Sequence, residues 1–233
     1  MTARASYPSP QVLELYNGEV MTSEEFQIAY EARPDDAKFE LIEGVVHMAS
    51  PAKLVHSNGD RFLNGLTWIY EGRTPGTHGG NSATVKFSPN TDLQPDGFLR
   101  ILSEYGGQTT ETEEGYLRGA PEFVIEVSNT SRSIDLNAKR LAYARHGVLE
   151  YLVLNLQEMR FHWFDLQTNL EIAIDPDEIC RVRKFPGLWL DCQAIVDYDI
   201  RRAEATLFAG LASSEHAAFV EELSRRRITP PAS

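Results

Sequence analysis

Apolar positions along this chain switch several times between period two and helical spacing, which predicts alternating strands and helices. The clearest strand covers residues 123–127, Phe-Val-Ile-Glu-Val, whose apolar members are aromatic or β-branched. A helical pattern follows directly, in which Asp135, Lys139 and Tyr143 recur every four residues along one face. Ser133 stands where a capping residue would be expected. This strand and helix are the centre of the predicted fold.

Shorter patterns predict the remaining elements. Alternating or apolar runs predict a hairpin over 39–48 that turns at Glu43-Gly44, and further strands at 84–87, 93–101, 150–155, 160–164, 170–174 and 179–183. Helices are predicted after the capping box Thr22–Glu25, from Pro51 onward, and at 203–211 and 214–227. Residues 72–80, 103–119 and 185–190 are expected to form loops. The order predicts an α/β fold with a mixed β-sheet flanked by helices.

The domain organisation follows from length and from the absence of a linker or repeat. The chain has 233 residues, enough for one domain with a substantial core. We expect an N-terminal arm over 1–20 with one short strand at 11–16, a single domain over 21–228 and a disordered tail over 229–233.

Composition and charge narrow the class of protein. The net charge of −12 argues against broad, non-specific binding of nucleic acid but leaves room for a nuclease with a local basic patch. No apolar run approaches the roughly 18 residues of a membrane helix, and the first residues lack the apolar core of a signal peptide. Cys180 and Cys192 do not have a metal-ligand spacing. These features predict a cytoplasmic protein with reduced thiols and no membrane partner.

Two acids supply the candidate chemistry. Glu126 lies inside an apolar strand, where a carboxylate needs a partner, a metal ion or a raised pKa. Asp96 lies between Pro95 and Gly97, residues that bend a strand and re-aim a side chain. Consecutive core strands are usually neighbours, so we expect the two carboxylates to meet and to require a cation or a proton between them. Such oxygen-rich pairs suit magnesium or manganese.

A simpler interpretation exists for each of these features. Glu126 could be an edge-strand acid, Asp96 could form a turn, and Asp135 with Lys139 could be a solvated pair on the helix surface. His56 lies on the long predicted helix, where a single histidine is more often structural than functional.

The order and spacing of these motifs resemble the Uma-two family of restriction endonucleases, in the PD-(D/E)xK nuclease superfamily. The motifs are Pro95-Asp96, Glu126-Val-Ser128, Lys139 with Tyr143, residues 146–153, residues 39–44 with His56, and residues 185–190. The resemblance spans about residues 20 to 225 and implies a restriction-endonuclease-like core with an N-terminal β-hairpin and C-terminal helices. The superfamily pattern has lysine two residues after the second acid, where this chain has Ser128. The resemblance implies that Lys139 replaces it from the next helix.

The resemblance also implies an activity, the hydrolysis of phosphodiester bonds in nucleic acid, with DNA the expected substrate. Asp96, Glu126 and the Val127 carbonyl would hold Mg²⁺ or Mn²⁺. Lys139 would orient the attacking water or stabilise developing charge, and its loss is expected to abolish cleavage with little effect on stability. Glu40 would reach the metal ion through water, and His56 would contact phosphate or orient Glu40.

Two alternatives remain open. The first is a catalytically inactive nuclease-fold module that acts in binding or oligomerisation, which the negative charge and Ser128 favour. The second is a metal-free acid/base pair formed by Asp96 and Glu126, as in glycosidases. The sequence leaves the oligomeric state open, with a homo-oligomer among the options.

Overall fold

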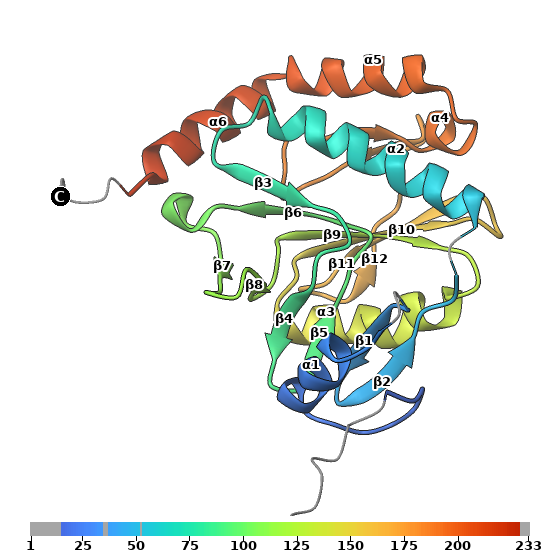
Figure 1. Ribbon diagram of the computed structural model, residues 1–233. Helices are drawn as coiled ribbons and strands as arrows, with labels where there is room; N and C mark the ends of the chain where they lie inside the picture. Colours follow the sequence, from blue (N-terminus) through green and yellow to red (C-terminus); the bar gives the residue numbers. More distant parts are fainter. Residues whose placement is uncertain (1–14, 35–36, 52, 229–233) are drawn as a thin grey trace, which may run out of the picture.

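The computed structural model describes residues 15–34, 37–51 and 53–228, which form an α/β fold (Figure 1). Two six-stranded sheets and one two-stranded sheet, β13-β14, are built from strands of two to six residues. The strands are β1 (Phe39–Ile42), β2 (Val45–Met48), β3 (Thr77–Gly80), β4 (Val85–Ser88), β5 (Thr91–Leu93), β6 (Gly97–Ile101), β7 (Thr110–Glu111), β8 (Leu117–Arg118), β9 (Phe123–Ser128), β10 (Glu150–Asn155), β11 (Arg160–Asp165), β12 (Leu170–Glu171), β13 (Ile179–Arg181) and β14 (Trp189–Asp191). The α-helices are α1 (Ser23–Glu31), α2 (Leu54–Glu71), α3 (Arg140–His146), α4 (Cys192–Val196), α5 (Ile200–Leu211) and α6 (Ser214–Arg226).

The central sheet has the order β12-β11-β10-β9-β6-β3 and is mixed. Strand β9 runs parallel to β10 and antiparallel to β6. Helices α2 and α5 lie over one face, and α3 lies on the other (Figure 1). The predicted fold class, with its N-terminal hairpin and C-terminal helices, is therefore confirmed.

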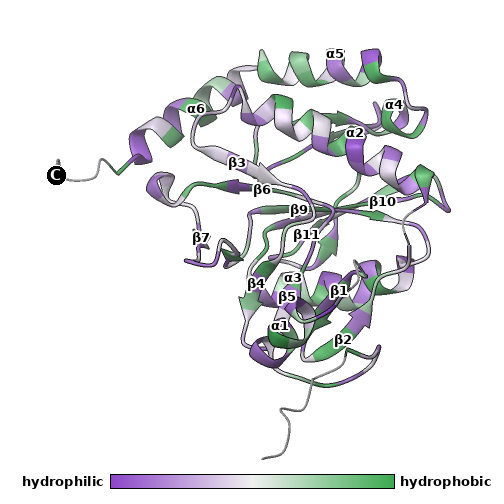
Figure 2. Cartoon of the chain, viewed as in Figure 1, coloured by the Kyte–Doolittle hydropathy of each residue, from purple (hydrophilic) through white to green (hydrophobic). Residues whose placement is uncertain are grey.

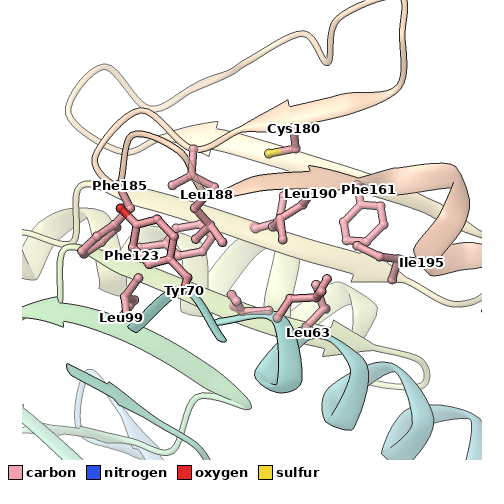
Figure 3. Close-up of a cluster of buried hydrophobic side chains, with 14 of the residues drawn as sticks. Leu63, Tyr70, Leu99, Phe123, Phe161, Cys180, Phe185, Leu188, Leu190 and Ile195 are labelled. Carbon is pink, nitrogen blue, oxygen red and sulfur yellow. The ribbon is translucent and has the colours of Figure 1, made fainter. Parts of the chain in front are cut away.

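A hydrophobic core fills the space between the central sheet and α2. Figure 3 shows Tyr70 of α2 beside Leu99 of β6, Phe123 of β9 and Phe185, while Leu63 of the same helix joins the cluster on the side of Ile195. Hydrophobic and hydrophilic residues alternate along α5 and α6, as expected of helices with one face on a core (Figure 2). No helix in the described part of the chain is both long and apolar enough to span a membrane.

Strand β9 alternates between two cores. Phe123 and Ile125 belong to the core under α2, whereas Val124 belongs to the core that contains Tyr143 of α3. Successive side chains of a strand point to opposite faces, so Glu126 points to the α3 face of the sheet. The strand pattern thereby aims a single carboxylate at the helix that follows it.

The second sheet has the order β2-β1-β5-β4-β8-β7. Its hairpin β1–β2 turns at Glu43 and Gly44, which have φ values of 50° and 84°. The predicted strand 93–101 is wrong as one element, because the chain leaves the second sheet after β5 and enters the central sheet at β6. Proline has no N–H for a ladder, which explains the break at Pro95. This crossing brings the hairpin carboxylate Glu40 close to the central sheet.

Other differences are local. The predicted loops 72–80 and 185–190 contain β3 and the start of β14, the segment 103–119 contains β7 and β8, and the strand predicted at 170–174 ends at Glu171. Ser133 makes no side-chain capping bond, because its backbone is already helical with φ −65° and ψ −34°. The following segment Ile134–Lys139 is a π-helix that leads directly into α3. Both cysteines are free and buried, as expected. Most of the expected strand 11–16 and the tail 229–233 lie outside the described residues.

Candidate active site

The ammonium group of Lys139 is the centre of a buried cluster of charges. Its Nζ atom lies 2.9 Å from Glu126 Oε1, 2.9 Å from Glu40 Oε2 and 3.8 Å from Asp135 Oδ1. Only 6% of Lys139 is exposed, so the pair that it forms with Asp135 is not a solvated surface pair. Burial alone would lower the pKa of Lys139, but the three carboxylates outweigh it and the pKa is raised well above its usual value. Lys139 is therefore charged, and its ammonium group is surrounded by carboxylates.

Glu126 is the most deeply buried of the predicted acids, with 2% of its surface exposed. Its Oε1 atom accepts hydrogen bonds from Lys139 Nζ at 2.9 Å and from the Tyr143 hydroxyl at 2.7 Å. Burial raises the pKa of Glu126 well above its usual value, Lys139 lowers it, and the charge of Asp96 raises it further. The charge of Asp96 thus acts on Glu126, and shared binding of an ion by the two carboxylates stays a prediction.

The sheet register explains why Asp96 lies opposite Glu126. Strand β6 pairs Gly97 with Ile125 of β9, and one further antiparallel step places Asp96 opposite Glu126. The main-chain carbonyl of Asp96 accepts hydrogen bonds from the side-chain amides of Asn64 and Asn81, at 3.0 and 2.9 Å. These bonds fix the backbone at the point where the chain crosses between the sheets.

The carboxylate of Asp96 has two donors of its own. Its Oδ2 atom accepts the Val127 N–H at 2.8 Å and lies 3.2 Å from His56 Nε2. Burial would raise the pKa of Asp96, but the hydrogen bond and charge of His56 outweigh it, and the pKa is lowered. The same bond raises the pKa of His56. His56 thus contacts Asp96 rather than Glu40, which was one of the two partners expected for it.

Glu40 reaches the cluster from the second sheet. Its Oε2 atom contacts Lys139, and its Oε1 atom accepts the Gln94 N–H at 2.8 Å. Gln94 belongs to the crossing segment just before Asp96. The crossing segment therefore carries Asp96 and also donates the main-chain N–H that holds Glu40.

The backbone of Val127 faces the strand that Asp96 precedes. Leu156 N–H bonds to the Ser128 carbonyl, so even-numbered residues of β9 face β10 and Val127 faces β6. The continued register sets Pro95 opposite Val127. Proline has no N–H, so it cannot donate to the Val127 carbonyl in the ladder. The Val127 N–H donates to Asp96 Oδ2 instead, and the Val127 carbonyl points toward β6.

The chemistry of this donor set fits a hard divalent cation. Two carboxylates and a main-chain carbonyl are oxygen ligands of the kind that Mg²⁺ and Mn²⁺ prefer. No hydrogen bond among the described residues uses Glu126 Oε2. Within 15–34, 37–51 and 53–228, no three side chains of His, Cys, Asp or Glu are gathered so as to hold an ion by themselves. The expected ligand set has only two such side chains, Asp96 and Glu126, and takes its third oxygen from the main chain.

Three further groups were not among the sequence candidates. Asp135 and Tyr143 share a helix face with Lys139, and that spacing was the signal that could have placed them in the site. His47 lies opposite Glu40 in the β1–β2 hairpin, and burial lowers its pKa. Hairpin pairing of 39–48 was the only signal for His47.

Comparisons with known proteins identify the family and the fold. A family model described as "Uma2: Putative restriction endonuclease" matches residues 23–193. The crystal structure of a putative nuclease belonging to DUF820 from Anabaena variabilis is similar, with a TM-score of 0.54 and 16% sequence identity over 82% of this chain and 99% of that chain. At that identity the likeness establishes the fold alone. No curated protein matched the chain. The family model covers most of the sequence, and the chain belongs to the Uma2 family.

Proposed function

We propose that the protein is a divalent-metal-dependent nuclease that hydrolyses phosphodiester bonds of DNA. The observation that carries the proposal is the position of Lys139, whose ammonium group lies 2.9 Å from Glu126 although 13 residues separate them in the chain. A helical lysine thus stands beside the second acid, where the superfamily pattern would place one from the strand. Membership of the Uma2 family and the likeness to a nuclease fold support the same activity.

Asp96, Glu126 and the carbonyl of Val127 would hold the ion in this proposal, with Glu40 acting through water. A bound Mg²⁺ or Mn²⁺ supplies a Lewis acid that polarises the phosphate and lowers the pKa of water. The protein's own residues do the rest. His56 donates to Asp96 and keeps that carboxylate ionised and oriented.

Lys139 has the second role in the proposed reaction. The neighbouring carboxylates raise the pKa of Lys139, so its ammonium group stays cationic across the physiological pH range. An ammonium group at this position can orient a water molecule or stabilise the charge that develops on a phosphate oxygen. Its side chain is held by contacts on both sheets, which limits the reorganisation needed during reaction.

A plasmid-cleavage assay tests the proposal. Supercoiled DNA is incubated with the wild type in Mg²⁺, in Mn²⁺ and in excess EDTA, with an RNA substrate in parallel. We expect DNA cleavage in either ion and none in EDTA. Glu126→Gln should lower the rate by more than about 100-fold, beyond the effect of residues that only support a ligand.

Glu150→Gln is the matched control. Glu150 is also a buried β-strand acid, 1% exposed, and it accepts bonds from Trp163 and from main-chain N–H groups at the far end of β10. Its loss should reduce stability without a comparable loss of rate. Cleavage that survives EDTA would refute metal dependence. A wild type that cleaves neither substrate would favour the inactive binding module.

A further inference from the structure

The hydroxyl group of Tyr143 is the second donor to Glu126, and nothing above assigns it a role. Tyr143 is fully buried, and its hydroxyl lies 2.7 Å from Glu126 Oε1. The same Glu126 oxygen also accepts a hydrogen bond from Lys139 Nζ at 2.9 Å. Among the described residues, Glu126 is the partner of that hydroxyl.

The ring of Tyr143 is held rigidly. It packs edge-to-face on Phe87, with ring centroids 5.6 Å apart, and against Tyr151 at 5.2 Å. Tyr151 is itself anchored, since its hydroxyl donates to the Asp135 carbonyl at 3.1 Å. The π-helix and α3 therefore present Lys139 and Tyr143 to one carboxylate oxygen from a packed scaffold. A tyrosine has only two side-chain torsions, so its hydroxyl is more precisely placed than the end of a lysine.

Two donors on one oxygen restrict the rotation of a carboxylate. With Oε1 fixed by Lys139 and Tyr143, the plane of the Glu126 carboxylate is set and Oε2 is left to face a ligand. Lysine alone would set this plane poorly, because its ammonium group also binds Glu40 and lies near Asp135. The tyrosine contributes a bond whose direction does not depend on those other acids.

We propose that Tyr143 is a positioning residue that orients Glu126 for divalent-ion binding by fixing Oε1 and presenting Oε2. This inference rests on the proposed function, since it assigns the ion to Glu126. It predicts that the hydroxyl group, rather than the aromatic ring, sets the affinity for the ion.

Tyr143→Phe isolates the hydroxyl, because phenylalanine keeps the ring packing. Mn²⁺ binding to the full chain without DNA is measured by isothermal titration calorimetry, below the melting temperature of each variant. Groups that orient a metal ligand contribute about 10- to 100-fold in affinity, so we expect the Kd for Mn²⁺ to rise about tenfold. Saturating Mn²⁺ should then restore the DNA cleavage rate to within about twofold of wild type, because only the occupancy was lost.

Tyr70→Phe is the matched control. Tyr70 is another fully buried tyrosine, and its hydroxyl donates to the Pro186 carbonyl at 2.9 Å in the core under α2. It should lower the melting temperature and leave the Kd for Mn²⁺ unchanged. A Tyr143→Phe protein with wild-type or tighter affinity would overturn the inference, as would equal weakening in Tyr70→Phe. A wild type that binds no Mn²⁺ would instead overturn the proposed function itself.

Discussion

Replacement of Lys139 by methionine is the most informative single perturbation of stability. Methionine keeps much of the length and apolar character of the side chain but removes the charge that compensates Glu126 and Glu40, each 2.9 Å away. Removing one partner of a buried ion pair typically costs about 3–5 kcal/mol, because the other charge is left uncompensated. The sequence-based expectation that losing this lysine changes stability little did not include the cost of leaving these acids uncompensated around a side chain that is only 6% exposed.

The loss should depend on pH, and its sign follows from Glu126. The pKa of Glu126 in the folded protein is raised by burial, so the ionised carboxylate destabilises the fold once the pH exceeds that raised value. Lys139 offsets this cost in the wild type. In Lys139→Met the penalty should therefore be largest at neutral and alkaline pH. It should shrink as the pH falls through the raised pKa of Glu126 and the carboxyl group takes up a proton.

Urea unfolding followed by circular dichroism at pH 8 and pH 5 measures both effects. At pH 8 we expect the free energy of unfolding to fall by about 3–5 kcal/mol, equivalent to roughly 6–20 °C in Tm for a domain of this size. Lys184→Met is the control, since Lys184 is only partly buried and donates to Gln167 at 2.9 Å. It should change stability by less than about 0.5 kcal/mol. A loss below about 1 kcal/mol in Lys139→Met, or an equal loss at both pH values, would refute the electrostatic reasoning.

Three further predictions concern Asp96 and its supports. A hundredfold excess of Mg²⁺ or Mn²⁺ over Kd should stabilise the wild type by about 2.7 kcal/mol, and Asp96→Asn should lose this Tm shift at constant ionic strength; equal shifts would place the ion elsewhere. Gly97→Ala puts a Cβ 2.8 Å from Asn64 Oδ1 and should lower both Tm and the cleavage rate. Gly65→Ala is the control, because its Cβ meets nothing within 4 Å, and it should raise the free energy of unfolding by about 0.5–1 kcal/mol through helix propensity. His56→Ala should cost more stability at pH 6 than at pH 9 in urea unfolding, because the raised pKa of His56 means that its bond to Asp96 is strongest below the ordinary histidine pKa and is lost as the pH rises. A pH-independent cost would show that the bond is not ionic.

The sequence predicted the strand-to-helix unit of the site because two independent signals agreed there. A single acid inside a β-branched run identified Glu126, and four-residue spacing placed Lys139 on the inner face of the next helix. Both follow from local periodicity, which a single sequence contains. The neighbouring position of Asp96 followed from the tendency of consecutive strands to pair.

Tertiary features explain what the sequence could not predict. The chain changes sheets between Leu93 and Gly97, and no local pattern distinguishes this crossing from a bend within one strand. The π-helix at Ile134–Lys139 also has no period that a reading of α-helical spacing could detect. The burial of Lys139 depends on Glu40, which arrives from another sheet. The role of Lys139 in stabilising the fold could therefore be recognised only once the positions of both sheets were known.

The position of a bound ion would show whether Asp96 and Glu126 hold the cation of the proposed nuclease. Crystals of the full chain soaked in Mn²⁺ can be examined by anomalous diffraction. We expect a peak between the carboxylates of Asp96 and Glu126, about 2.0–2.6 Å from their oxygens and from the Val127 carbonyl. A strong peak bound elsewhere, or none here at Mn²⁺ concentrations that support cleavage, would contradict it.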